Sequence, residues 1–427
     1  MTAPGAPSAA GAPSPSGARP PHAASIPEPR LRAIADEIGT PTYVYDARAI
    51  DEGARRWIDA VGDPARVCFA AKANSNLSVL ARLERRGIGV EVATPGELAR
   101  ARRAGFPARR IVLGGVPKSA EVVRDGLREG VGLLVVQSGH EVEAAVAHAA
   151  ESPAGPAEVG VRVRPGIRAG AHPSLETGRA DAKFGLAPAD VPAAWRALSA
   201  AARLRPTTLA VHLGSGLHDL APYEEALALM LELASDLGAA GARVEEIDIG
   251  GGLGIDYGGG EDPDPRELVR RVTALAGPGG PRLRFEPGRS IVARAGILLT
   301  RVLYRRERDG SAALVCDAGS TDFARYALYG GQHRILPLSG EETGEPTVDV
   351  LGPTCESGDV LGTGRRLHAV RPGDLLVVRD TGAYGFVMAS NYNSRPRPAE
   401  VLVEGSGHRV VRTRERLDDL WRGEDLP

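Results

Sequence analysis

The sequence predicts an α/β fold in which a (β/α)8 barrel is followed by a C-terminal β domain. Eight short apolar runs alternate with helical stretches between residues 67 and 289. After residue 289 helices become scarce, and strand-like runs are separated by Gly/Pro turns. The 427 residues are enough for two such domains. An open, doubly wound sheet is the alternative, because a strand count made from sequence can be wrong by about one or two.

The predicted barrel strands are buried runs rich in Val, Ile and Leu, each bounded by turn or helix signals. They span residues 67–71, 88–92, 110–113, 132–136, 159–163, 208–211, 246–249 and 283–285. Ala-, Leu- and Arg-rich segments between them, such as 77–86, 95–104 and 223–240, are expected to form the outer helices. We place the barrel at residues 51–293.

Both ends of the chain are expected to lie outside the barrel. Residues 1–25 are mostly Ala, Pro, Gly and Ser, a composition typical of a disordered tail. Residues 26–50 contain a predicted helix at 28–38 and a predicted strand at 42–45, and we expect this segment to pack with the β domain. The β domain spans residues 294–427, with strands at 296–304, 312–316, 348–351, 374–378 and 399–403.

Composition excludes several classes of function. The formal net charge of −2 gives no support for binding nucleic acid or a membrane surface. The sequence shows no apolar run long enough to span a bilayer and no signal peptide, so we expect a cytoplasmic protein. Cys68, Cys316 and Cys355 are far apart, which favours neither a disulfide framework nor a metal site.

Lys72 is conspicuous because the chain has only three lysines, although Lys and Arg together number 52. It directly follows the end of the first predicted strand. A lysine that loses solvation at a strand end has a lowered pKa and can attack an aldehyde, which an arginine cannot do. The alternative is a lysine whose aliphatic stem packs at the strand end while its amine stays in water.

Three later strands end in polar or glycine-rich segments, at the face where barrel active sites form. His212 and Ser215 follow the sixth strand, Gly250 to Gly254 the seventh, and Glu286 to Arg289 the eighth. Backbone N–H groups of the glycines can bind a phosphate, although a tight turn is the alternative. If the cofactor is pyridoxal phosphate, Glu286 suits its pyridine nitrogen, and His212 suits a ring face unless it is a core histidine.

In the β domain, Cys355 lies among turn residues and carboxylates in the segment 352–359. This setting is poor for packing and suitable for proton transfer, whereas Cys68 and Cys316 are better explained as small buried residues. Tyr384 lies between two glycines, Gly382 and Gly385, where its hydroxyl is expected to reach a phosphate.

Together and in this order, these motifs resemble those of the fold type III pyridoxal-phosphate decarboxylases. The resemblance covers residues 40–405, and segment 390–396 is similar to the branch of the family that acts on diaminopimelate. It implies the barrel and β domain of the alanine-racemase and ornithine-decarboxylase type. The matching segments are 71–74, 96–98, 172–173 with 177–178 and 183–185, 212–215, 250–254, 286–289, 352–357 and 382–385.

The resemblance implies a role for each matching residue. Lys72 would hold pyridoxal phosphate covalently, His212 would stack on its ring, and Glu286 would pair with the pyridine nitrogen. Around the phosphate would lie Ser215, Gly251, Gly252, Gly288, Arg289 and Tyr384. Cys355 would return a proton to the substrate α-carbon from the second subunit of a homodimer. Substrate carboxylates would bind Arg289, Arg325, Tyr329 and Tyr384, and the distal amino group would bind Glu356.

The expected activity is decarboxylation of meso-2,6-diaminopimelate to L-lysine in lysine biosynthesis. Glu286 disfavours a racemase-like relative, and Arg325 offers a partner for a distal carboxylate that ornithine lacks. Several residues depart from the family pattern, including Glu91, Gly216, Ser320 and Tyr326. A paralogous decarboxylase acting on another amino acid or conjugate, as in siderophore or antibiotic pathways, is therefore the alternative. A catalytically silent cofactor-binding homologue is disfavoured because Lys72, Glu286 and Cys355 are all present.

Overall fold

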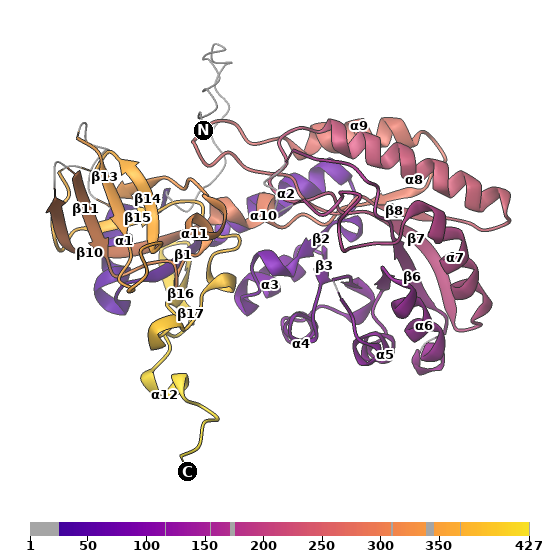
Figure 1. The fold of residues 1–427 in the computed structure, drawn as a ribbon, viewed down its shortest axis with the longest axis horizontal. Helices are drawn as coiled ribbons and strands as arrows, with labels where there is room; N and C mark the ends of the chain where they lie inside the picture. The colour runs from indigo at the N-terminus through magenta and orange to yellow at the C-terminus, as the bar shows by residue number, and fades with distance from the viewer. Residues whose placement is uncertain are drawn as a thin grey trace.

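The computed structural model describes residues 25–426 except positions 116, 154, 171–175, 309–310, 339–345 and 368. Figure 1 shows a barrel with outer helices beside a β domain. The predicted tail lies outside the described residues apart from Ser25, and so does the segment 172–173 that contributes to the resemblance. In the described part of the chain, no helix is both long and apolar enough to cross a membrane.

Eight parallel strands form the barrel in the order in which they occur in the chain. They are β2 (Cys68–Ala70), β3 (Gly89–Val92), β4 (Ile111–Leu113), β5 (Leu133–Val136), β6 (Ala157–Arg162), β7 (Leu204–Ala210), β8 (Glu246–Asp248) and β9 (Arg282–Arg284). The ring closes because Cys68 N–H donates to the Phe285 carbonyl at 2.8 Å and Phe285 N–H donates to the Arg66 carbonyl at 2.9 Å. All eight predicted strands are present, and this closure excludes the open doubly wound sheet.

Helices cover the outside of the barrel, and several begin at a side chain that caps the first turn. Asn76, Thr94, Ser119 and Ser138 each accept a hydrogen bond from a backbone N–H two or three residues later. The outer helices are α3 (Leu77–Glu84), α4 (Pro95–Arg103), α5 (Ala120–Glu129), α6 (Gly139–Ala147), α7 (Val191–Ala200), α8 (Ala221–Ala239) and α9 (Pro265–Ala276). Each cap fixes where a loop at the carboxyl end of a strand turns into its helix.

The β domain is a nine-stranded sheet that includes the N-terminal strand β1 (Thr42–Asp46), which follows α1 (Glu28–Ile38). β1 pairs antiparallel with β10 (Gly296–Arg308) and parallel with β16 (Ala399–Glu404). The N-terminal segment therefore contributes the strand between them. The other strands are β11 (Ser311–Cys316), β12 (Ile335–Pro337), β13 (Val348–Leu351), β14 (Val360–Arg365), β15 (Leu375–Val378) and β17 (Gly407–Arg412).

Three strands of this sheet are absent from our sequence prediction. β14 contains two glycines, β12 has only three residues and ends in a proline, and β17 carries a histidine and two arginines in six residues. Each feature interrupts the apolar or alternating pattern by which a strand is recognised. These strands form because neighbouring strands supply their hydrogen bonds, with β14 and β17 at the two ends of the sheet order.

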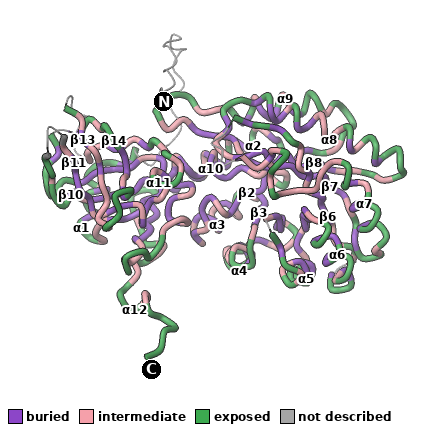
Figure 2. The backbone as a smooth tube through the Cα atoms, in the orientation of Figure 1, coloured by how far each residue is buried: buried purple, intermediate pink, exposed green. Residues whose placement is uncertain are grey.

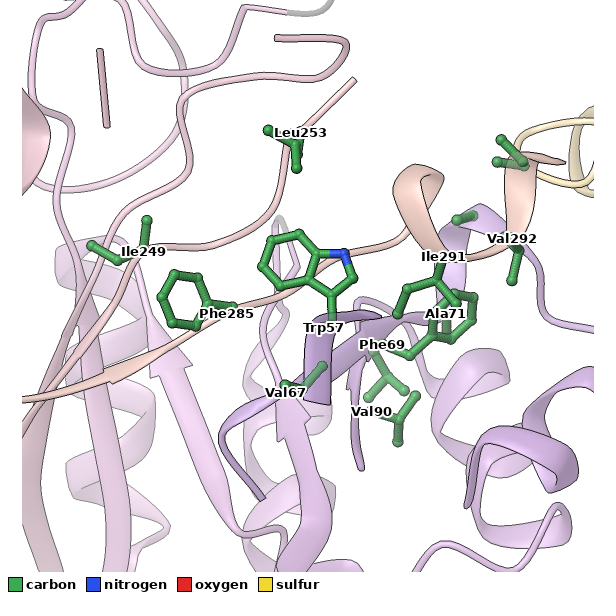
Figure 3. Close-up of a cluster of buried hydrophobic side chains, with 14 of the residues drawn as sticks. Trp57, Val67, Phe69, Ala71, Val90, Ile249, Leu253, Phe285, Ile291 and Val292 are labelled. Atoms are coloured by element: carbon green, nitrogen blue, oxygen red, sulfur yellow. The ribbon is translucent and has the colours of Figure 1, made fainter. Parts of the chain in front are cut away.

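Helix α2 (Ala47–Val61) fixes the segment that follows β9. Its buried Trp57 packs against Phe285 with ring centroids 5.8 Å apart and donates to Ser290 Oγ at 3.0 Å (Figure 3). A Cβ at Gly53 would lie 2.2 Å from the Ile291 carbonyl oxygen, so only glycine allows this close approach. The start of α10 (Arg289–Val292) is thus held against the core.

Figure 2 shows buried residues along the barrel strands and exposed residues on the outer helices.

Candidate active site

Residues from separate barrel strands meet at the carboxyl-terminal face of the barrel. Lys72 follows β2, His212 follows β7, the glycines follow β8 and Glu286 follows β9. Glu286 N–H donates to the Gly250 carbonyl at 2.8 Å, and Gly251 N–H donates to His212 Nδ1 at 3.4 Å. The ends of β7, β8 and β9 are therefore in direct contact, as expected for an active site on this fold.

Lys72 is paired with a carboxylate of the neighbouring strand. Its Nζ donates to Oε2 of the buried Glu91 on β3 at 2.8 Å. Desolvation lowers the pKa of Lys72, but the charge of Glu91, with smaller contributions from Tyr384 and Glu286, raises it above the ordinary value. Our expectation of a lowered pKa is therefore wrong, because an opposite charge outweighs the loss of solvation.

Arg289, Ser215 and Tyr257 form a polar corner beside the glycines. Arg289 donates to Ser215 Oγ at 2.9 Å and to the Tyr257 hydroxyl at 2.6 Å. The side chain is buried, its Nε has no hydrogen-bond partner, and no carboxylate among the described residues forms an ion pair with it. A buried cation with spare donors is suited to an anion such as a phosphate group.

The glycines leave room at this corner. A Cβ at Gly251 would lie 2.2 Å from the Glu286 carbonyl oxygen, and Gly252 has a φ of +111° that side-chain-bearing residues rarely adopt. A Cβ at Gly288 would lie 2.9 Å from that of Ala73, beside Lys72. The backbone can therefore approach a bound group closely, and the corner fits the phosphate of pyridoxal phosphate.

Glu286 lies in a carboxylate-rich part of the site. Burial raises its pKa well above the ordinary value, and the charges of Asp248 and Glu91 add to the rise. Asp248 is itself 1% exposed, and burial raises its pKa to about 6. A cationic group beside Glu286 would relieve this repulsion, and a protonated pyridine nitrogen is such a group.

His212 is a neutral aromatic ring at the same face. Burial lowers its pKa well below the ordinary value, and the positive charges of Lys72 and Arg162 lower it further. Its Nδ1 accepts the Gly251 N–H, so the ring proton belongs on Nε2. A flat, uncharged ring held in this way suits stacking on an aromatic cofactor.

Arg325 and Tyr329 lie on α11 (Arg325–Tyr329) of the β domain. This helix is next to the polar corner of Arg289, Ser215 and Tyr257, which we call the phosphate corner. The Arg325 guanidinium is 5.2 Å from the centroid of the Tyr257 ring, and that of Arg289 is 5.9 Å from the same centroid. Tyr329 contributes to the electrostatic surroundings of both arginines. Two buried guanidinium groups therefore lie against the same Tyr257 ring.

Tyr384 lines a cleft of about 380 Å³ together with Lys72. Its φ is +56°, and its N–H donates to the Ala73 carbonyl at 2.8 Å, which fixes the tyrosine beside the lysine segment. The Arg289 guanidinium lies 4.8 Å from the centroid of its ring. The cleft is also lined by Ser75, Glu97, Arg100, Phe386, Val387, Met388, Arg397 and Arg412.

Cys355 and Glu356 lie in an exposed loop after β13. Cys355 Sγ is 3.6 Å from Asn393 Oδ1, and the Tyr392 hydroxyl donates to Glu356. Across the described residues, no hydrogen bond or ion pair joins this loop to Lys72. A single chain therefore brings together the predicted cofactor residues and Arg325, but it leaves the predicted proton donor in a separate exposed loop.

Besides Glu91, three residues at the site are missing from our predicted set. Tyr257 follows the glycine-rich segment, His333 follows α11, and Asp248 ends β8 two residues before Gly250. Only Asp248 had a usable signal, as a carboxylate at a buried strand end. Among the described residues, no group of three or more His, Cys, Asp or Glu side chains is placed to hold a metal ion.

Known proteins resemble this chain over nearly its whole length. Residues 47–293 match the pyridoxal binding domain of pyridoxal-dependent decarboxylases. The chain is 41% identical to a diaminopimelate decarboxylase of Pseudomonas fluorescens over 397 residues, which is 93% of this chain and 95% of the relative. It is 38% identical to that of Zymomonas mobilis over 404 residues, covering 92% and 94%.

A solved structure is similarly close. The diaminopimelate decarboxylase of Helicobacter pylori, crystallised with L-lysine, superposes with a TM-score of 0.87 at 35% identity. The match covers 92% of this chain and 98% of the other. Both the barrel and the β domain are therefore shared with that protein.

Proposed function

Because the chain belongs to the diaminopimelate decarboxylase family of pyridoxal-dependent decarboxylases, we propose that it converts meso-2,6-diaminopimelate to L-lysine and carbon dioxide. One observation carries the choice of substrate. Arg325 is 5% exposed and has no carboxylate partner among the described residues. Its guanidinium lies against the ring of Tyr257, whose hydroxyl is bonded to Arg289 in the phosphate corner. A buried guanidinium without a counterion calls for an anionic ligand, and a distal carboxylate provides one.

The residues at the barrel face would hold pyridoxal phosphate in one orientation. Lys72 would bind its aldehyde, Glu286 its pyridine nitrogen and His212 one ring face. Pyridoxal phosphate supplies an aldehyde for the substrate amine and a ring that withdraws electrons from bonds to the α-carbon. The phosphate would be held by Ser215, Gly251, Gly252, Gly288, Arg289 and Tyr384.

The remaining residues would orient the substrate and move its proton. Arg325 and Tyr329 would bind the distal carboxylate, and Arg289 and Tyr384 would contact the substrate from the cofactor side. The bond between the α-carbon and the other carboxylate breaks, and carbon dioxide leaves. The Cys355 thiol would then donate its proton to the same carbon, which gives the ε-carbon of L-lysine.

We also propose that the active unit is a homodimer in which Cys355 and Glu356 come from the partner subunit. This accounts for the exposed loop that carries them, which among the described residues has no hydrogen bond or ion pair to Lys72 of its own chain. Glu356 would bind the distal amino group of the substrate. A reduced thiol is required at Cys355, which favours the cytoplasm as the place where the enzyme works.

The alternative, a paralogous decarboxylase of another pathway, is not favoured. The curated relatives that share 34–41% identity with this chain over 90% or more of its length are diaminopimelate decarboxylases. The departures at Gly216, Ser320 and Tyr326 do not remove Arg325 or Glu356. We therefore retain meso-2,6-diaminopimelate, which carries two carboxylates, as the proposed substrate.

Release of carbon dioxide from the purified, cofactor-loaded protein tests the proposal. The substrates are meso-diaminopimelate, its LL isomer, lysine, ornithine and arginine. We expect release only from the meso compound, with L-lysine as the product. Release from ornithine or lysine instead, or turnover that survives Lys72→Ala, would contradict it.

A further inference from the structure

The guanidinium of Arg325 is held by one neutral side chain, that of His333. Arg325 Nε donates to His333 Nε2 at 3.1 Å. Among the described residues this is the hydrogen bond of the Arg325 side chain, and none of them bonds to its two terminal amino groups. A guanidinium has five N–H donors, so four of them remain for a ligand.

The protonation of His333 follows from its partners. Its Nδ1 lies 2.7 Å from the Arg379 carbonyl oxygen, which can only accept a hydrogen bond. Nδ1 therefore carries the ring proton and Nε2 is the acceptor that Arg325 needs. Burial and the charge of Arg325 lower the pKa of His333 to about 3, so the ring stays neutral near pH 7.

The His333 ring is fixed by packing as well as by hydrogen bonds. It is fully buried, its centroid lies 4.3 Å from that of Tyr257, and the Phe323 ring meets it edge-on at 4.7 Å. Tyr257 also contacts Arg289, so the histidine belongs to one cluster with Tyr257 and the two guanidinium groups. A ring held on three sides cannot turn without disturbing this cluster.

We propose that His333 is a positioning residue that holds Nε of Arg325 and turns its two terminal amino groups toward the distal carboxylate of the substrate. With Nε occupied, the edge formed by the two terminal amino groups is the one left for a paired contact with a carboxylate. His333 thereby sets the selectivity for ligands that carry a carboxylate at the end remote from Lys72. This inference rests on the proposed function, because it requires a substrate with a distal carboxylate.

L-Lysine and pentane-1,5-diamine make a matched pair of probes, because they differ only in that carboxylate. Their dissociation constants are measured by calorimetry on the cofactor-loaded protein for wild type, His333→Phe, His333→Gln and Arg325→Met. Phenylalanine keeps an aromatic ring against Tyr257 but has no acceptor for Nε. Glutamine keeps an acceptor, and it also provides a test if the phenylalanine variant does not fold.

We expect wild type to prefer L-lysine and His333→Phe to reduce that preference by about tenfold or more, with the affinity for the diamine unchanged. His333→Gln should recover part of the preference. In steady-state kinetics, His333→Phe should raise KM for meso-diaminopimelate more than it lowers kcat. A purely structural role would weaken both ligands equally, and that result would overturn the inference.

The Arg325→Met variant separates failure of this inference from failure of the proposed function. If Arg325→Met abolishes the preference for L-lysine while His333→Phe retains the full wild-type ratio, the role of His333 is wrong and that of Arg325 stands. If Arg325→Met itself retains the preference, the carboxylate is bound elsewhere and the proposed substrate contact fails, together with the inference.

Discussion

Lys72 and Glu91 form an ion pair across two neighbouring barrel strands, with Lys72 Nζ 2.8 Å from Glu91 Oε2. The lysine side chain is 38% exposed, whereas that of the glutamate is 4% exposed. An ammonium group is not a nucleophile, so Lys72 must lose a proton before it attacks an aldehyde. Glu91 opposes that loss because it raises the pKa of the lysine.

Replacing Glu91 by glutamine should make Lys72 more reactive toward pyridoxal phosphate at neutral pH. Removal of the carboxylate lowers the pKa of the lysine, and about one pKa unit corresponds to about tenfold more free amine. The measurement is the rate at which the absorbance of the bound cofactor appears after its addition to cofactor-free protein, as a function of pH. Glu97→Gln is the control, because Glu97 lines the same cleft without a hydrogen bond to Lys72. An identical pH profile in Glu91→Gln and wild type would contradict the prediction.

Tyr257→Phe should weaken cofactor binding. The Tyr257 hydroxyl accepts a hydrogen bond from Arg289 at 2.6 Å, and a hydrogen bond to a charged group contributes about 1.5–3 kcal/mol. Equilibrium dialysis of pyridoxal phosphate should therefore show a loss of about tenfold or more in affinity. Tyr326→Phe is the matched control, since its hydroxyl pairs with Thr363 on an exposed surface. Equal affinities in the two variants would show that Tyr257 does not support Arg289.

The sequence predicts the barrel well because each of its strands is a local signal. An apolar run between turn residues, such as the segment around β5 (Leu133–Val136), is sufficient to indicate a buried strand. The same reasoning misses β14 and β17, where glycines and charged residues replace the apolar pattern. Those strands exist because a neighbour supplies their hydrogen bonds, which no local pattern records.

Contacts between distant segments explain what the sequence does not predict at the site. Lys72 is recognisable by its position, but the sign of its pKa shift depends on Glu91, which is on the next strand. His333 and Tyr257 carry no motif that indicates a site. Their importance arises only when the β domain brings Arg325 and Arg289 to the same tyrosine ring.

Mixing two inactive variants tests the shared active site of the proposed dimer. Lys72→Ala and Cys355→Ala each remove one part of every site in a homodimer. A mixed dimer has one complete site, so an equal mixture should regain about one quarter of the wild-type activity after subunit exchange. Carbon dioxide release is the measurement, and native mass spectrometry confirms that mixed dimers form. Mixed dimers without activity would show that Lys72 and Cys355 act within one chain.

Lys118→Met should destabilise the barrel strongly. Lys118 Nζ lies 2.9 Å from Glu141 Oε2, and both side chains are 1% exposed. Loss of the lysine leaves a buried carboxylate without its counterion, which costs about 3–5 kcal/mol. Urea unfolding followed by circular dichroism gives the change in free energy of unfolding.

Arg55→Met is the control, because it removes an ion pair to Glu52 from a side chain that is 53% exposed. Its loss should lower the free energy of unfolding by less than about 1 kcal/mol. Similar losses in the two variants would contradict this account.

The buried, neutral state of His333 gives the free energy of unfolding a pH dependence of known sign. Its pKa falls from 6.5 to about 3 on folding, mainly through burial. Between these values the unfolded chain binds a proton that the folded protein does not, so acid favours the unfolded state. From this residue alone, wild type should lose about 1.4 kcal/mol for each pH unit below about 6.5. His333→Gln lacks this titration, so the stability of wild type relative to the variant should decrease between pH 6.5 and 4.5. Guanidinium unfolding of both proteins at several pH values measures this difference, and a constant offset across the range would show that His333 is protonated, or exposed, in the folded protein.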